Sequence, residues 1–305
     1  MASLVTLIKR FVAPALPYPT EEYDKQYFNK LLSVLRIYFN QLDQLLGQVV
    51  ANSNAINNES TASADFFTQV ARGKVTGASQ VNIFAYSENV KPAPTYYTLW
   101  ELTGTTQYAF PTSAVVMTLA STSASDNTQA TVIVNGLDST WNLQTEIVTL
   151  NGTSNVNTAK SFLRINNMIL TSPGTGQVTN VGVITAKNGG ITYAQINAAI
   201  GRTQSALYSV PNGYTMYLYS INAFNGDASA GNFLNYQVKS TNNALTNPVT
   251  LTILQTSWDT QYQVIRQNPF PYTQKTDVQW QFSTNSGTHH CGLILQGILI
   301  SNTAE

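Results

Sequence analysis

Histidine and cysteine, which often bind metal ions, occur next to one another at one place in this chain, His289-His290-Cys291. The sequence contains two histidines and one cysteine in all, so none is left elsewhere to extend the cluster. Zinc requires four ligands, or three and a water molecule, which this cluster does not supply. In a strand, His289 and Cys291 would share one face and His290 would lie on the other. We therefore predict no metal and no cofactor, and a small buried thiol in a strand.

Residues suited to acid–base or nucleophilic catalysis occur without the spacing that such chemistry needs. The two histidines are adjacent and the chain has no Gly-x-Ser-x-Gly motif, which argues against a serine hydrolase. The glycine turns at Gly174-Thr-Gly176 and Gly189-Gly190 lack the helix and lysine of a phosphate-binding loop. We therefore predict that the protein is not an enzyme.

Several carboxylates are scattered between residues 126 and 277. Aspartate favours turns because its side chain hydrogen-bonds the backbone two residues on, so we expect these residues at turns or strand ends. They are Asp126, Asp138, Glu146, Asp227, Asp259 and Asp277. A glycosidase pair remains the alternative, because two carboxylates from distant loops suffice for that reaction.

Aromatic side chains are numerous for a chain with so few charges. They include Tyr96, Tyr97, Trp100, Tyr214, Tyr217, Tyr219, Trp258, Tyr262, Tyr272 and Trp280. Packing within strands and at subunit interfaces is the favoured interpretation, since Tyr and Trp are enriched in both places. The alternative is binding of a glycan, for which Trp258 and Tyr272 are the candidate contacts because they lie in or near predicted loops.

The charge balance limits the kinds of partner. The 305 residues include 15 basic and 15 acidic side chains, which argues against binding to nucleic acid through phosphate neutralisation. Charged residues make up 10% of the chain, against about 25% in an average soluble domain, and amides and hydroxyls take their place. Such a surface resists association weakly, so it is typical of a protein that works within an assembly.

Neither export nor membrane insertion is expected. The start of the chain places Lys9 and Arg10 after a short apolar run, whereas a secretory signal has its positive charges before a longer one. The longest apolar run, Gly292–Ile300, is far shorter than the roughly 20 residues that span a bilayer. We expect synthesis in a cytoplasm and no contact with a membrane.

Two segments precede the β-rich part of the chain. Residues 1–20 carry Pro14, Pro17 and Pro19, which predict an extended attachment arm because proline fixes φ and blocks helix. Residues 21–58 predict a helix that Thr20 would cap. Its apolar side chains recur at alternating steps of three and four, the a/d pattern of a heptad repeat. They are Phe28, Leu31, Leu35, Tyr38, Leu42, Leu45, Val49 and Ile56.

Two interpretations of this helix remain open. It could pack against the β-structure of its own chain, or it could form a parallel bundle with other copies. Leu32, Phe39 and Leu46 widen the apolar stripe, which favours a trimer over a dimer, and Asn52 within the stripe is a residue type that fixes register.

From residue 66 the hydrophobic period changes to two. Apolar residues alternate with polar ones, and turn signals such as Asn135-Gly136 and Asn151-Gly152 follow at short intervals. We predict a mainly β fold with two antiparallel β-sandwich or jelly-roll domains, residues 66–192 and 201–305. Residues 193–200 are expected to form a brief helix or loop between them, and Pro269 and Pro271 a connection between strands.

Several motifs of the β-rich part resemble those of a family of tailed-bacteriophage virion proteins, common in marine and other environmental phages. They are Ala71–Gly77 followed by Trp100, Val134–Asp138, Glu146–Thr153, Phe162–Asn166, Gly201–Gly213 and Pro269–Asp277. The motifs are turn-and-strand signatures and carry no reaction. A long heptad helix before the first β-domain departs from the family's usual pattern.

This resemblance implies a structural component of a phage particle, located in the virion. The implied partners are further copies of the chain and other virion proteins, namely capsid, portal or tail. A capsid decoration or head fibre and a tail-associated fibre remain alternatives, and a tail protein that binds a host glycan is the third.

Overall fold

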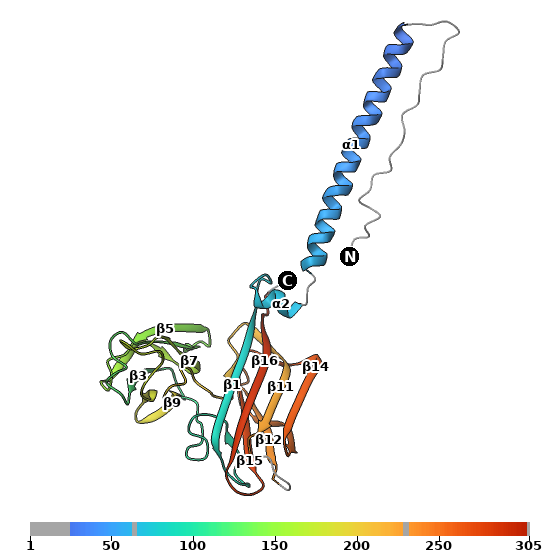
Figure 1. The fold of residues 1–305 in the computed structure, drawn as a ribbon. Helices are drawn as coiled ribbons and strands as arrows, with labels where there is room; N and C mark the ends of the chain where they lie inside the picture. Colours follow the sequence, from blue (N-terminus) through green and yellow to red (C-terminus); the bar gives the residue numbers. More distant parts are fainter. Residues whose placement is uncertain (1–24, 63–65, 228–231, 304–305) are drawn as a thin grey trace. The chain divides into compact units, whose positions relative to one another are not determined.

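A computed structural model describes residues 25–62, 66–227 and 232–303 (Figure 1). Within these ranges, the side chains of residues 45, 48–62, 254 and 255 are outside the description. The chain divides into two compact units, residues 1–69 and residues 70–305, and the second is called the β-unit below. The predicted arm with its three prolines and the capping Thr20 fall outside the described residues.

The predicted helix is present as α1, Lys25–Ala62, and it extends past the predicted end at residue 58. At 1.5 Å per residue, its 38 residues span about 57 Å. A second helix, α2, covers Phe66–Ala71 and contains the buried Val70. No described helix is long and apolar enough to cross a membrane.

The β-unit is built from antiparallel strands, which confirms the mainly β prediction. The strands are β1 (Ala78–Val90), β2 (Tyr97–Thr98), β3 (Val115–Ser121), β4 (Thr131–Leu137), β5 (Leu143–Thr149), β6 (Val156–Phe162), β7 (Arg164–Ser172), β8 (Ile184–Asn188), β9 (Ile191–Ile196), β10 (Leu207–Ser209), β11 (Tyr214–Asn225), β12 (Leu234–Asn242), β13 (Thr250–Trp258), β14 (Gln261–Tyr272), β15 (Thr276–Thr284) and β16 (His289–Ser301). They form four sheets, while assignment to a jelly roll or sandwich stays a prediction.

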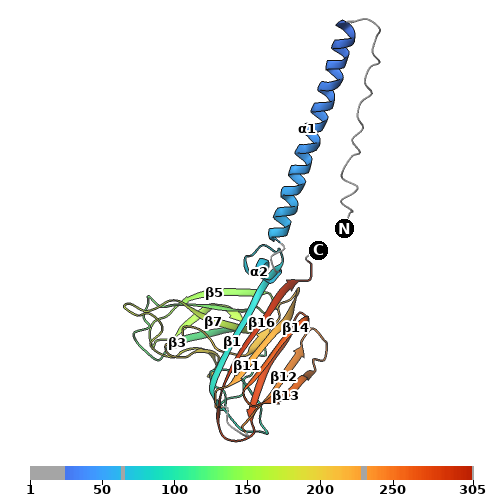
Figure 2. The ribbon, with the colours of Figure 1, turned by 45° about the vertical axis from the view of Figure 1, so that its right-hand side comes forward.

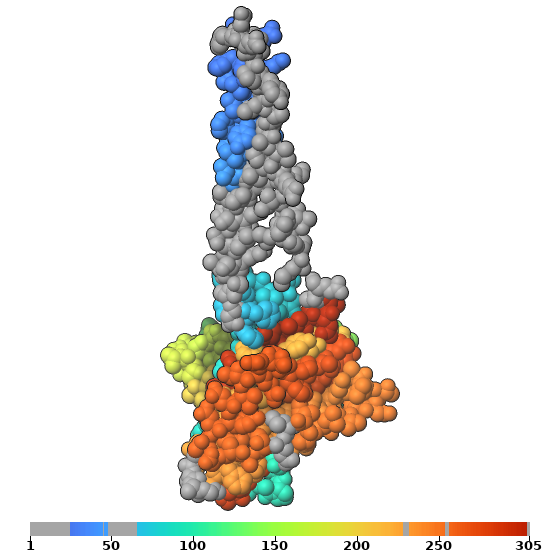
Figure 3. Space-filling view, turned by 90° about the vertical axis from the view of Figure 1, so that its right-hand side faces the viewer, coloured from blue at the N-terminus to red at the C-terminus, as the bar shows by residue number. Residues whose placement is uncertain are grey.

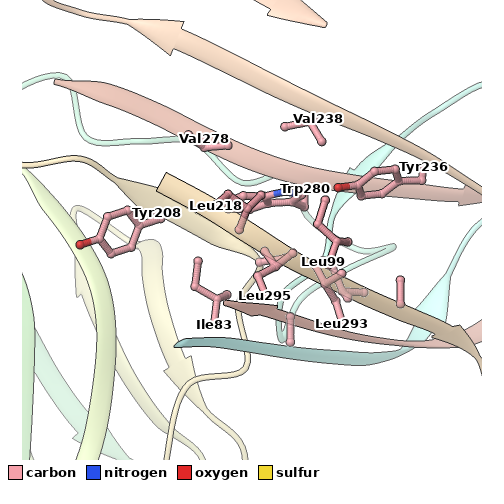
Figure 4. Close-up of a cluster of buried hydrophobic side chains, with 14 of the residues drawn as sticks. Ile83, Leu99, Tyr208, Leu218, Tyr236, Val238, Val278, Trp280, Leu293 and Leu295 are labelled. Atoms are coloured by element: carbon pink, nitrogen blue, oxygen red, sulfur yellow. The ribbon is translucent and has the colours of Figure 1, made fainter. Parts of the chain in front are cut away.

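Two sheets make up what we call the carrier region. One has the order β1-β16-β11-β14, and the other has the order β10-β15-β12-β13 with β2 paired to β15. Buried side chains from both sheets form one aromatic-rich core (Figure 4). Ile83 and Leu293 from the first sheet and Tyr236 and Trp280 from the second belong to it.

The other two sheets make up the inserted region, which follows β2 in the chain and returns to β10. Their orders are β6-β3-β8-β9 and β5-β4-β7, and they share a mostly aliphatic core that includes Met117, Leu119 and Phe162. Figure 1 shows β3, β5, β7 and β9 to the left of β1, β11, β14 and β16, and Figure 2 shows β5 and β7 next to β1. The two regions are therefore distinct in core and in strand pairing.

The strand pairing differs from the predicted division into residues 66–192 and 201–305. β1 and β2 lie in the predicted first domain, yet β1 pairs with β16 over its length and β2 pairs with β15. Alternation identifies which side chains of a strand are buried, but it does not identify the partner strand. The carrier region is thus discontinuous in sequence.

One local prediction was right in part and another was wrong. Of residues 193–200, which were expected to form a brief helix or loop, residues 193–196 belong to β9, and residues 197–200 form a turn in which Ala199 has a positive φ. Pro269 and Pro271 lie within β14 instead of a connection. β14 is the outermost strand of its sheet, where proline costs no ladder hydrogen bond on the free side. Figure 3 shows a face of the β-unit on which the C-terminal residues of the chain, in orange and red, predominate.

Candidate functional site

The histidine–cysteine cluster has the predicted geometry. His289 and Cys291 are buried in β16, whereas His290 is half-buried and its ring contacts Tyr86 at 6.4 Å between centroids. Burial raises the pKa of the Cys291 thiol far above its usual value, which disfavours the thiolate that metals bind. Among the described residues no three His, Cys, Asp or Glu side chains group as a metal site.

The two glycan candidates of the sequence analysis are core residues. Trp258 is 8% exposed and Tyr272 is 4% exposed. Trp258 stacks on Tyr262 with ring centroids 5.2 Å apart, and Tyr272 meets Trp280 edge-on at 6.3 Å. Each is the last residue of its strand, and these strand ends cover the core instead of reaching into solvent. The prediction that they are exposed contacts was wrong.

The apolar stripe of α1 is not buried by the described residues of its own unit. No α1 side chain that the structure describes is buried: Leu31, Leu35, Tyr38 and Leu42 are partly covered. Phe28 is 45% exposed, and in the neighbouring column Phe39 is 57% exposed. The side chains of Leu45, Val49, Asn52 and Ile56 lie outside the description. The described apolar side chains of α1 thus remain at least partly exposed, whereas many large apolar side chains of the β-unit are buried in its cores.

Four of the six predicted carboxylates fall into two groups. Asp138 and Asp259 accept hydrogen bonds from backbone N–H groups of their own turns, as predicted. Asp126 and Asp277 are buried, which turn chemistry alone does not explain. Asp126 accepts hydrogen bonds from the backbone N–H groups of Val181 and Gly182, at 2.8 and 2.9 Å, and so fixes a loop of the inserted region.

Of the other two predicted carboxylates, Glu146 lies in the middle of β5, not at a turn or strand end, and accepts hydrogen bonds from the Ala159 and Lys160 backbone N–H groups at 2.7 and 2.9 Å. Asp227 follows β11 and accepts one from the His290 backbone N–H at 2.6 Å.

Asp277 joins the carrier region to the inserted region. Arg164 of β7 donates from Nε and Nη2 to its two carboxylate oxygens, at 2.9 and 2.8 Å, and both side chains are buried. The remaining capacity of Asp277 is taken by the Ser209 hydroxyl and by Asn243 Nδ2. A buried ion pair is tolerated only when its other polar groups are satisfied, as they are here.

The guanidinium of Arg164 is held from other sides as well. Its Nη1 donates to the carbonyl oxygens of Pro111 and Leu163, each at 2.8 Å. Its Cζ atom lies 4.8 Å from the ring centroid of Phe110 and 4.6 Å from that of Trp141. We call Arg164, Asp277 and these partners the junction. It fixes the inserted region on the carrier region.

A second carboxylate links the two chain segments that connect the carrier region with the inserted region, one after β2 and the other before β10. Glu101 follows β2 and accepts hydrogen bonds from the Gln204 backbone N–H and from the Ser205 hydroxyl, the latter at 2.7 Å. Loss of hydration raises the pKa of Glu101 to about 7, although these hydrogen bonds act in the opposite direction. Glu101 was not singled out from the sequence.

A cleft of the β-unit with a volume of about 430 Å³ lies beside the junction. A second cleft of about the same volume is lined by Arg164 and Asp277 themselves. The outward side chains of β1, including Gln80, Asn82 and Phe84, line the first cleft, as do residues of β4, β5 and β7. Arg202, between β9 and β10, is the single charged residue in its lining. The Arg202 Cζ atom lies 4.6 Å from the ring centroid of Phe84.

Sequence reasoning singled out neither Arg164 nor Arg202. Arg164 and Arg202 entered only as letters of the motifs Phe162–Asn166 and Gly201–Gly213. The signal available for Arg164 was a charged residue inside an apolar, alternating strand, since arginine is seldom buried without a partner. Nothing local signals Arg202, because the residues around it in space come from β1 and β7.

No protein-family model and no curated protein matches the chain. Solved structures of infectious bursal disease virus do show a distant similarity. One, of the Gx strain, is 9% identical and covers 74% of this chain and 72% of its own, with a TM-score of 0.23. Another, a VP2 subviral particle of that virus, is 10% identical and covers 75% of this chain and 73% of its own, with a TM-score of 0.20. Scores this low carry no argument, so the proposals below rest on this chain's residues.

Proposed function

We propose that the protein is a non-enzymatic structural component of a virus particle, specifically of a tailed phage, that assembles through α1 and displays the β-unit. The observation that supports the proposal is the apolar stripe of α1, which the described residues of its own unit leave at least partly exposed. Burying one Leu or Phe side chain is worth about 1.5–3 kcal/mol, so a stripe of this length favours association strongly.

The occupant of the stripe is a second and third copy of the same helix. The alternating steps of three and four match the knobs-into-holes spacing of a parallel coiled coil. The additional column that contains Leu32 and Phe39 widens the apolar surface beyond a two-stranded seam, which favours a trimer. The arm before the helix is then free to attach the trimer to a capsid, portal or tail protein.

The β-unit suits display at the end of such a trimer. Its junction links the two β-regions through buried contacts, and its low charge is appropriate for a protein held within a particle. The resemblance of its motifs to tailed-phage virion proteins supports the same role. Whether it stands on the head as a decoration or fibre, or on the tail, is answered by labelling purified particles with an antibody to the β-unit.

Sedimentation of the full chain tests the assembly. We expect a trimer, and we expect Leu35→Asn with Leu42→Asn to yield a monomer at concentrations where the parent is trimeric. The matched control is Ser33→Asn with Gln44→Asn, which introduces the same residue at exposed positions outside the stripe. The control also carries the lower helix propensity of Asn, so this cost is the same in both variants. Since the control leaves the stripe intact, it should remain a trimer. A monomeric parent chain would refute the proposal.

A further inference from the structure

The cleft beside the junction contains a positively charged group without a counter-charge. Arg202 Nε is buried and makes no hydrogen bond, and no ion pair of Arg202 occurs among the described residues. Burial lowers the pKa of its guanidinium, since the charged form loses hydration. The uncompensated charge costs free energy in the unliganded protein, and an anion in the cleft would recover it.

Arg202 is held in a fixed position before any ligand arrives. Its backbone bridges to Ile169 of β7, and the adjoining residues continue the pairing. The Leu170 N–H donates to the Gly201 carbonyl at 2.8 Å, and the Thr203 N–H donates to the Met168 carbonyl at 2.9 Å. The Phe84 ring then supports the guanidinium from one side. A group fixed in this way loses little freedom on binding.

The walls around Arg202 are rich in amides that are partly engaged with one another. On one wall the Thr145 hydroxyl donates to Asn135 Oδ1, and Asn135 Nδ2 donates to Asn167 Oδ1, each at 2.9 Å. This chain orients Asn167 so that its Nδ2 makes no hydrogen bond within the described residues. On the opposite wall Asn82 donates to Gln80, which leaves the Asn82 carbonyl oxygen as an acceptor.

These observations point to a ligand with a carboxylate, several hydroxyl groups and a small apolar face. We propose that the cleft binds an acidic saccharide, with the sugar carboxylate on Arg202, sugar hydroxyls on Asn82 and Asn167, and the apolar face of the ring near Phe84 and Leu143. An arginine fork pairs with a carboxylate through two hydrogen bonds, and amides both donate to and accept from hydroxyls. The volume of about 430 Å³ is within the range of small-ligand sites.

This site differs from the glycan contacts predicted from the sequence. Trp258 and Tyr272 are buried in the carrier core, whereas the cleft lies between β1 and the inserted region. The proposal is independent of assembly through α1, because every residue that lines the cleft belongs to the β-unit.

The test is calorimetric titration of the full chain with two probes, a hyaluronan tetrasaccharide, which contains glucuronate, and chitotetraose, which is neutral. We expect the acidic probe to bind at least tenfold more tightly, and Arg202→Gln to remove that preference. Arg266→Gln is the matched control, because Arg266 is also a half-buried arginine of the carrier region whose Nε lacks a partner. It should bind as the parent does.

Three results would overturn the proposal. They are equal affinity for the two saccharides, no binding of either, and tighter binding of a tetraglutamate peptide, which would make the cleft a site for an acidic protein segment. If Arg202→Gln fails to fold, Asn167→Ala provides the second variant. It keeps the charge and should weaken binding of the acidic probe several-fold, and unchanged binding by a folded Asn167→Ala protein would equally contradict the proposed contacts.

Discussion

In α1, the large apolar side chains Phe28, Leu32, Ile37 and Phe39 are exposed, whereas in the β-unit residues of the same kind, such as Phe162 and Trp280, are fully buried. Both patterns are regular in the sequence, with heptad steps in the helix and alternation in the strands. In the β-unit, one sheet covers the apolar face of another within the same unit. The described residues of the unit that contains α1 offer its stripe no such cover.

The carrier and inserted regions repeat this comparison on a smaller scale. Each has its own apolar core, and the cores differ in composition, one aromatic-rich and the other aliphatic. What joins them is mainly polar: the junction around Arg164 and Asp277, the Glu101 contacts, and backbone pairing near Arg202. Polar contacts fix an orientation at a cost in desolvation. Arg202, in the cleft beside them, has the same kind of cost.

The largest expected effect separates the helix from the β-unit. In the Leu35→Asn and Leu42→Asn double variant, each copy of the bundle loses two buried leucines and gains two amides in its seam, so we expect loss of the concentration-dependent helical transition. The β-unit has its own cores and should unfold at an unchanged temperature. Circular dichroism at 222 nm and tryptophan fluorescence, recorded against protein concentration, follow the two transitions separately. Coincident shifts in both would break the comparison.

The next effect separates the carrier region from the inserted region. Arg164→Leu leaves Asp277 buried without its cation, which should destabilise the β-unit by about 3–5 kcal/mol. Arg72→Leu removes an exposed arginine and should change stability by less than about 0.5 kcal/mol. Urea unfolding measures both. We further expect the Arg164→Leu transition to broaden or split, and a single sharp transition with parental stability would show that the junction does not couple the regions.

The sequence was informative wherever a structural feature depends on neighbours along the chain. The period of the apolar residues located α1 and the β-rich part of the chain after it, and the alternation around Cys291 placed its thiol inside. The burial of Trp258 and Tyr272 could not be obtained in this way. Both end a strand, and whether a strand end covers a core or faces solvent depends on the sheet across from it.

Pairing between distant segments was the other missing part. β1 and β16 are joined although about 200 residues separate them, and Arg164 meets Asp277 across 113 positions. Neither strand carries a local mark of its partner, because backbone ladders are made by groups that every residue has. The cleft is a consequence of the same long-range pairing, so a search for adjacent functional residues could not find it.

The smallest effect concerns Glu101, which links the two connections between the regions. Its folded pKa of about 7 lies above the ordinary value of 4.5, so the folded state holds the proton more tightly than the unfolded state does. Stability from this group is therefore complete below about pH 4.5, declines as the pH rises toward 7, and is level above that. Glu101→Gln keeps an acceptor and a donor for Gln204 and Ser205 without the charge.

We expect Glu101→Gln to match the parent near pH 4.5 and to exceed its stability at pH 8 by on the order of 2 kcal/mol. Urea midpoints at the two pH values give the comparison. Glu88→Gln, which replaces an exposed carboxylate of β1, should leave the difference between the two pH values unchanged. If the Glu101→Gln chain shows the parent's pH dependence, the carboxylate is already ionised at little cost. Hydration, together with the hydrogen bonds from Gln204 and Ser205, would then be enough to stabilise the ionised carboxylate of Glu101.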